Sequence, residues 1–102
     1  NNGLGKAFSP TDSIATALAS CMFTIMGIKS RDLDIDLSNS KADVNKVMES
    51  NPRRISEIHI HFNMNVKLSS KDQTILEKAA MTCPVIYSIH PDIKKEIHFN
   101  WG

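Results

Sequence analysis

The stretch that decides the fold is SPTDSIATALASCMFTIMGI, residues 9–28. It begins with a helix-start signal, because Ser9 can cap a helix, Pro10 suits the first helical position and Asp12 suits the first turn. Apolar residues then recur every three or four positions, the spacing of one helix face; they are Ile14, Leu18, Cys21, Ile25 and Ile28. Alanine, methionine and phenylalanine cover most of the remaining circumference. We therefore predict a long central helix that ends within 27–31 and is buried on nearly all sides.

Beyond this helix, three segments have the period of a strand. Residues 33–37 alternate leucine or isoleucine with aspartate, as a strand with one wet face does. Residues 41–49 fit either a strand or a helical turn, and the turn residues that follow at 50–52 favour the strand. Residues 58–68 alternate strictly between apolar and polar side chains, so a long antiparallel hairpin should join them to 41–49.

The last third of the chain predicts two helices and a strand. Ser70 and Gln73 form a capping box that should start a helix over 71–82. Pro84 cannot lie inside that helix but suits the first turn of a new, short one. Residues 96–101 alternate again and predict a final strand. The expected fold class is therefore α+β, an antiparallel sheet with a long buried central helix and a second helix.

Composition and charge limit the classes of protein to which the chain can belong. With 102 residues, 41% of them hydrophobic and 23% charged, it suits one globular domain spanning residues 1–102. Twelve basic residues balance eleven acidic ones, so we expect no nucleic acid partner. The uncharged apolar stretch 14–28 is shorter than the roughly 20 residues of a membrane span. The first ten residues also lack a basic leader, so we expect no membrane association and a cytoplasmic location.

The chain contains two cysteines, Cys21 and Cys83, too few for a disulfide scaffold or a four-thiolate zinc site. Unpaired cysteines are often small buried hydrophobes, and that interpretation stays open here. Their placement favours chemistry, because one lies in the central helix, the other lies at a helix break, and both could point to one place. Cys83 directly precedes the Pro84 helix, whose N-terminus should lower the pKa of its thiol and make it the more acidic of the two.

Histidines and aspartates offer a metal alternative. His59 and His61 share the wet face of one predicted strand, and His98 could join them from another to bind zinc. Polar residues on the exposed face of an antiparallel sheet are the ordinary expectation, however. The aspartates within 32–36 have the spacing of a calcium loop but lack its glycine and its final glutamate. We therefore predict no metal site and no cofactor.

Three runs of sequence carry a resemblance to a known family. Residues 9–12 (SPTD), 19–23 (ASCMF) and 82–85 (TCPV), with NPRRI at 51–55 between them, resemble the OsmC/Ohr family of osmotically inducible and organic hydroperoxide resistance proteins. The resemblance covers essentially the whole chain. It implies that Cys21 is the peroxidatic thiolate on the central helix and that Cys83 is the resolving thiol. Together they would reduce organic hydroperoxides and be reset by an external dithiol, of a lipoyl type in family members.

The resemblance implies further features of the site. Family members take an activating arginine from a strand before the central helix, and the chain opens on Asn-Asn-Gly-Leu-Gly without Met, so we expect an N-terminal part of the domain to be missing. A glutamate near the start of that helix pairs with the arginine, and Asp12 is its predicted catalytic counterpart here. Apolar side chains such as Met22, Phe23 and Ile86 should shape the pocket.

The resemblance also implies an intertwined homodimer with its active sites at the subunit interface. The alternative function is a non-catalytic dimer of the same fold that binds a small apolar ligand, its cysteines being part of the core.

Overall fold

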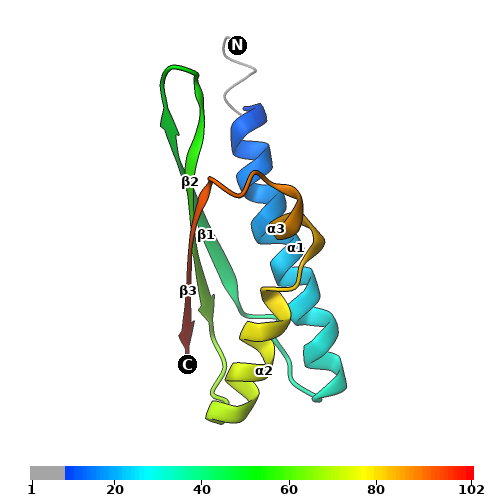
Figure 1. The fold of residues 1–102 in the computed structure, drawn as a ribbon. Helices are drawn as coiled ribbons and strands as arrows, with labels where there is room; N and C mark the ends of the chain where they lie inside the picture. The colour runs from blue at the N-terminus through cyan, green and yellow to red at the C-terminus, as the bar shows by residue number, and fades with distance from the viewer. Residues whose placement is uncertain (1–8) are drawn as a thin grey trace.

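A computed structural model describes residues 9–102, which form one layer of strands and one layer of helices (Figure 1). The elements in chain order are α1 (Pro10–Asp32), β1 (Lys41–Glu49), β2 (Arg54–Met64), α2 (Ser70–Ala80), α3 (Pro84–Ser88) and β3 (Lys94–Trp101). All three helices lie on the same side of the sheet (Figure 1). The predicted α+β class is confirmed. The opening residues, on which we based the expectation of a missing N-terminal part, lie outside the described residues.

The sheet has the strand order β1-β2-β3. β1 and β2 form the predicted antiparallel hairpin, from Lys41 opposite Asn63 to Glu49 opposite Arg54, with a register shift between Val47 and Met48. β3 instead runs parallel to β2, so the prediction of a wholly antiparallel sheet is wrong. The reason is the connection: α2 and α3 lie between β2 and β3 and carry the chain back to the end of the sheet where β2 begins.

Residues 33–37 do not form the predicted strand, because they end helix α1. Asp34 has a left-handed backbone with φ 59°. Its N–H donates to the carbonyl of Arg31 at 3.1 Å, and the N–H of Ile35 donates to the carbonyl of Ser30 at 2.8 Å. These two bonds are a Schellman helix end, in which aspartate replaces the usual glycine. The alternation of leucine and aspartate thus reflects a helix terminus.

The helix starts follow local chemistry. The Ser9 hydroxyl accepts the N–H of Asp12 at 3.4 Å, which confirms the predicted start of α1. Helix α2 is capped by Ser69, one residue before the predicted Ser70, with the N–H of Asp72 donating at 3.2 Å. Both hydroxyls occupy donors that the first helical turn leaves unpaired.

Helix α1 is buried on one side only, contrary to the prediction that other structure surrounds it. Its buried residues are Ala15, Leu18, Ala19, Met22, Met26 and Ser30. Ile14 and Ile28, which we placed in the apolar stripe, are 42% and 54% exposed. Among the described helices α1 alone is long and apolar enough to cross a membrane. It has 23 residues, more than the apolar stretch 14–28 from which we expected no membrane span. Core helices of soluble proteins meet the same criterion, and α1 packs on the sheet and on α2.

The core lies between α1 and the central strand β2. Ile58, Ile60, Phe62 and Met64 alternate along β2 with no more than 1% exposure. Leu76, Ala80 and Cys83 close the core from the α2 side. Each large buried side chain contributes about 1.5–3 kcal/mol relative to exposure, so this layer holds the helices and the two cysteines in place.

Candidate functional site

The two cysteines meet in the layer of helices. Cys21 lies in the middle of α1 and is half-buried, whereas Cys83 stands directly before α3 and is fully buried. Cys21 packs against the buried core that contains Cys83, and it is close enough to contribute to the raised pKa of the Cys83 thiol. Both are free thiols. The structure thus brings together the two residues that the sequence singled out.

Pro84 fixes the position of Cys83. Proline disfavours helical backbone in the residue before it, and Cys83 is extended, with φ −66° and ψ 142°. As the N-cap of α3, its sulfur accepts the N–H of Ile86 at 3.4 Å. The break between α2 and α3 therefore turns the thiol inward towards α1.

Burial raises the pKa of the Cys83 thiol above its ordinary value. The N–H of Ile86 acts against this change, and the neighbouring Cys21 adds to it. The prediction that the N-terminus of α3 lowers the pKa of Cys83 is therefore wrong. A helix of five residues offers few N–H groups, and their effect is smaller than the cost of placing a thiolate in the core.

Of the apolar residues predicted to shape a pocket around the thiols, Met22 and Phe23 pack mainly in the core. Met22 is fully buried in the core. Phe23 packs edge-on against Phe62, with ring centroids 5.8 Å apart. Of the three predicted pocket residues, Ile86 is the one whose backbone binds a cysteine sulfur.

Asp12 is not brought to the thiols. It precedes Cys21 by about 13.5 Å along the helix axis, and its carboxylate accepts the Lys46 ammonium at 2.6 Å. Sequence analysis missed Lys46, although the alternation of β1 already places it on the inward face with Val44 and Met48. Only 19% of its side chain is exposed. The observed role of this pair is to tie the start of α1 to β1, and the catalytic role of Asp12 stays a prediction.

His59, His61 and His98 lie on the outer face of the sheet. His61 and His98 stack, with ring centroids 4.8 Å apart, and His59 binds Glu57 at 2.8 Å. Within residues 9–102, no group of three or more histidine, cysteine, aspartate or glutamate side chains is arranged to hold a metal ion.

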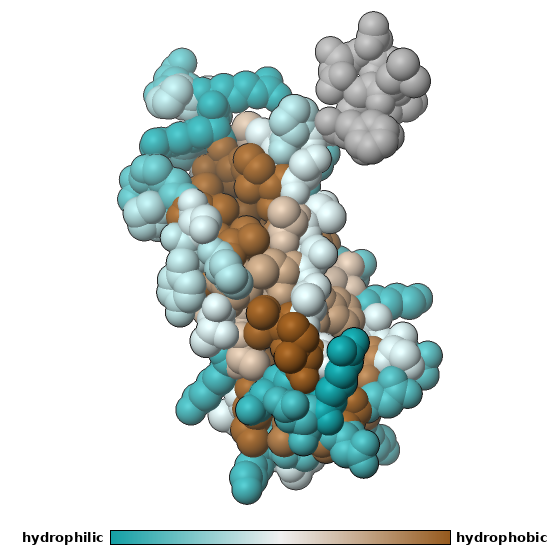
Figure 2. Space-filling model, turned by 90° about the vertical axis from the view of Figure 1, so that its right-hand side faces the viewer, coloured by the Kyte–Doolittle hydropathy of each residue, from teal (hydrophilic) through white to brown (hydrophobic). Residues whose placement is uncertain are grey.

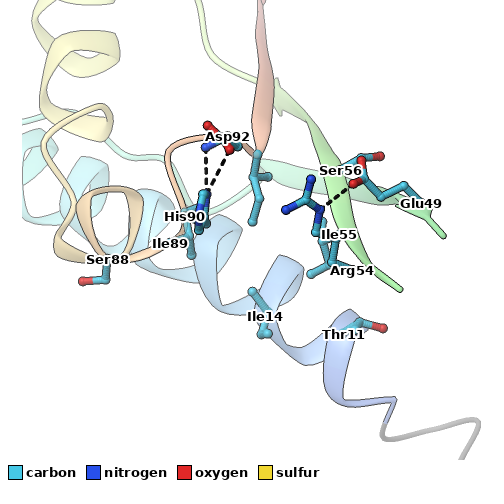
Figure 3. A pocket seen from close by; sticks show the side chains of 11 residues that line it. Thr11, Ile14, Glu49, Arg54, Ile55, Ser56, Ser88, Ile89, His90 and Asp92 are labelled. Carbon is cyan, nitrogen blue, oxygen red and sulfur yellow. Dashed lines mark hydrogen bonds and ion pairs between the residues drawn. The ribbon is translucent and has the colours of Figure 1, made fainter. Parts of the chain in front are cut away.

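A cavity of about 500 Å³ opens at the end of the molecule where α1 begins (Figure 3). The lining residues are Thr11, Ile14, Glu49, Arg54, Ile55, Ser56, Ser88, Ile89, His90, Asp92 and Ile93. Neither cysteine lines it. Sequence analysis did not find this cavity, because its four isoleucines come from three separate segments with no shared motif.

These observations can be set beside known proteins. Residues 3–98 match the family described as OsmC-like protein. The chain belongs to the OsmC-like family. No curated protein matches the chain. In this OsmC-like chain, the cysteines carried by the resemblance are the two that the fold places side by side.

Several solved structures resemble this OsmC-like chain. One, from Psychrobacter arcticus 273-4, is 53% identical, has a TM-score of 0.91, and matches over 98% of this chain and 73% of that one. Its name provisionally describes an osmotic stress induced and detoxification response protein. An organic hydroperoxide resistance protein OsmC from Legionella pneumophila is 15% identical, with a TM-score of 0.71 over 89% of this chain and 68% of that one. The organic hydroperoxide resistance protein OhrB of Bacillus subtilis is also 15% identical, with a TM-score of 0.65 over 89% and 69%. At 15% identity the last two show the shared fold.

Proposed function

We propose that this chain belongs to a thiol peroxidase that reduces organic hydroperoxides, with Cys21 as the attacking thiolate and Cys83 as the resolving thiol. The OsmC-like family and the names of the Legionella and Bacillus proteins support this class of reaction. The observation that carries the proposal is the proximity of two free cysteines from distant parts of the chain.

The chemistry runs in three balanced steps. The Cys21 thiolate attacks the distal peroxide oxygen, an S–O bond forms as the O–O bond breaks, and the alkoxide takes a proton and leaves as an alcohol. Cys21 has then lost two electrons and is a sulfenic acid. The Cys83 sulfur attacks it, forming the S–S bond, while the hydroxyl leaves with the Cys83 proton as water. An external dithiol, of a lipoyl type by resemblance, reduces the disulfide and is itself oxidised to a disulfide.

Burial and pKa support this division of roles. The first step requires a thiolate that the peroxide can reach. Cys83 has no exposed surface, and its raised pKa keeps it protonated near neutral pH. Cys21 is the partly exposed thiol. Cys83 suits the second step, because it already lies beside the sulfur that it must join.

We also propose that the protein is a homodimer in which two α1 helices pack together. One face of α1 is exposed and carries small side chains, which permit two helices to approach closely; they are Ser13, Thr16, Ala17, Ser20 and Thr24. Ile28, 54% exposed, lies on the same helix.

The dithiol reductant fits a reducing compartment, so we also propose that the protein acts in the cytoplasm.

Peroxide consumption with a dithiol reductant tests the proposed function. We expect the wild-type protein to turn over an alkyl hydroperoxide and both Cys21→Ser and Cys83→Ser to lose turnover. A sulfenic acid should be trapped with dimedone in Cys83→Ser only, since Cys21 is intact there and no thiol resolves it. Equal activity of all three proteins would exclude the mechanism.

A further inference from the structure

We infer that the cavity at the start of α1 is a binding site for an uncharged linear amphiphile, an alkyl chain that ends in a hydroxyl or carbonyl oxygen. Its volume of about 500 Å³ lies in the range of roughly 300–1,000 Å³ that is typical of small-molecule sites. Since neither cysteine lines it, the site is separate from the proposed peroxidase chemistry.

Four isoleucines form the apolar walls. Ile14 comes from α1, Ile55 from β2, and Ile89 and Ile93 from the connection between α3 and β3. Ile14 is 42% exposed, and its side chain extends from α1 towards the space in front of the connection (Figure 3). The helical side of the molecule shows an apolar area towards this end (Figure 2). An alkyl chain placed here removes apolar surface from water on both partners.

The rim of the cavity supplies hydrogen-bond donors. The Arg54 Nε donates to the Glu49 carboxylate, and the other guanidinium N–H groups of Arg54 have no partner within residues 9–102. The His90 Nδ1 accepts the backbone N–H of Asp92 at 3.0 Å, so a neutral His90 carries its proton on Nε2. Both donors suit an oxygen acceptor at the end of an apolar chain.

The rim gives a charged head group little to offset its lost hydration. Arg54 and Glu49 already pair with each other, and Asp92 is largely exposed, so an ion pair with any of them contributes little, whereas an ion that enters the apolar site loses hydration. A hydroxyl or carbonyl oxygen loses far less hydration and still accepts an N–H bond. The walls and the rim therefore select the same class of ligand.

Calorimetric titration of the full chain with 1-octanol, octanoate and octylammonium tests this inference. We expect saturable binding of one 1-octanol, and at least tenfold weaker binding of either charged analogue. Ile14→Trp fills the cavity and should weaken octanol binding at least tenfold. The matched control is Met81→Trp, because Met81 is 41% exposed, close to the 42% of Ile14, lies at the end of α2 and does not line the cavity; this variant should bind octanol like the wild type.

Three results would overturn the inference: no saturable octanol binding, a charged analogue binding as tightly as octanol, or Ile14→Trp binding like the control. Should Ile14→Trp fail to fold, Ile93→Phe fills the cavity from another wall and must weaken binding in the same way. Peroxide consumption plays no part in this experiment, so its outcome is independent of the peroxidase proposal.

Discussion

Iodoacetamide should label Cys21 in the folded protein well before it labels Cys83. The Cys83 side chain has no exposed surface, and its sulfur accepts the Ile86 N–H at 3.4 Å. Exposing the thiol breaks that hydrogen bond, which costs about 1 kcal/mol. It also brings a small buried side chain into water, which costs about 1.5 kcal/mol. The total of about 2.5 kcal/mol slows labelling roughly 50- to 100-fold. Burial also raises the pKa of Cys83, which lowers its thiolate fraction and slows the reaction further.

Mass spectrometry of proteolytic fragments, taken over a time course near neutral pH, measures the two labelling rates separately. The control is the same chain in urea, where both thiols are exposed and should react at similar rates. If Cys83 reacts as fast as Cys21 in the folded chain, then Cys83 is accessible and the assignment of roles from burial fails.

Three further predictions concern stability, all measured by urea unfolding. Burial raises the folded-state pKa of Cys83 above the ordinary 9.0. The contribution of Cys83 to the free energy of unfolding is therefore complete below that pH and is lost as the pH rises through the folded pKa. Cys83→Ala should lose less stability than the wild type as the pH is raised. Leu18→Ala, at a site with no exposure, should lower the free energy of unfolding by about 2–5 kcal/mol, and an equal loss for the exposed Ile28→Ala would contradict the orientation of α1. A double-mutant cycle of Asp12→Asn and Lys46→Met should give a coupling of about 0.2–1 kcal/mol, and no coupling would contradict the observed ion pair.

Local chemistry made much of the fold predictable. Ser9 caps α1 because its hydroxyl and Pro10 act within one turn. The hairpin of β1 and β2 follows from alternation on both sides of a turn. The direction of β3 could not be read from its own residues, since it depends on how the intervening helices carry the chain back along the sheet.

Two local errors have separate physical causes. Aspartate tolerates a left-handed backbone, so Asp34 ends α1 without the glycine that usually marks such a terminus. The predicted stripe on α1 is right for Leu18, which is buried, and wrong for Ile14 and Ile28, which are exposed, because apolar side chains occur all around this helix. The sheet then buries Met22 and Met26, flexible side chains that fill uneven spaces, while Ile14 stays exposed.

The identity of the two cysteines could be predicted from the sequence, but their burial and the groups around them could not. The sequence contexts pointed to Cys21 and Cys83, and the fold places them together. Helix position alone misjudged the acidity of Cys83, because the extent of burial is a tertiary property. Lys46 binds Asp12 across two elements, and that pairing also depends on how the layers meet.

The most direct test is the mass of the product formed when the reduced protein meets one equivalent of an alkyl hydroperoxide. We predict an intramolecular disulfide that links Cys21 to Cys83, as peptide mapping under non-reducing conditions would show. A wild-type protein that stops at a stable sulfenic acid on Cys21, or remains fully reduced, would contradict the account.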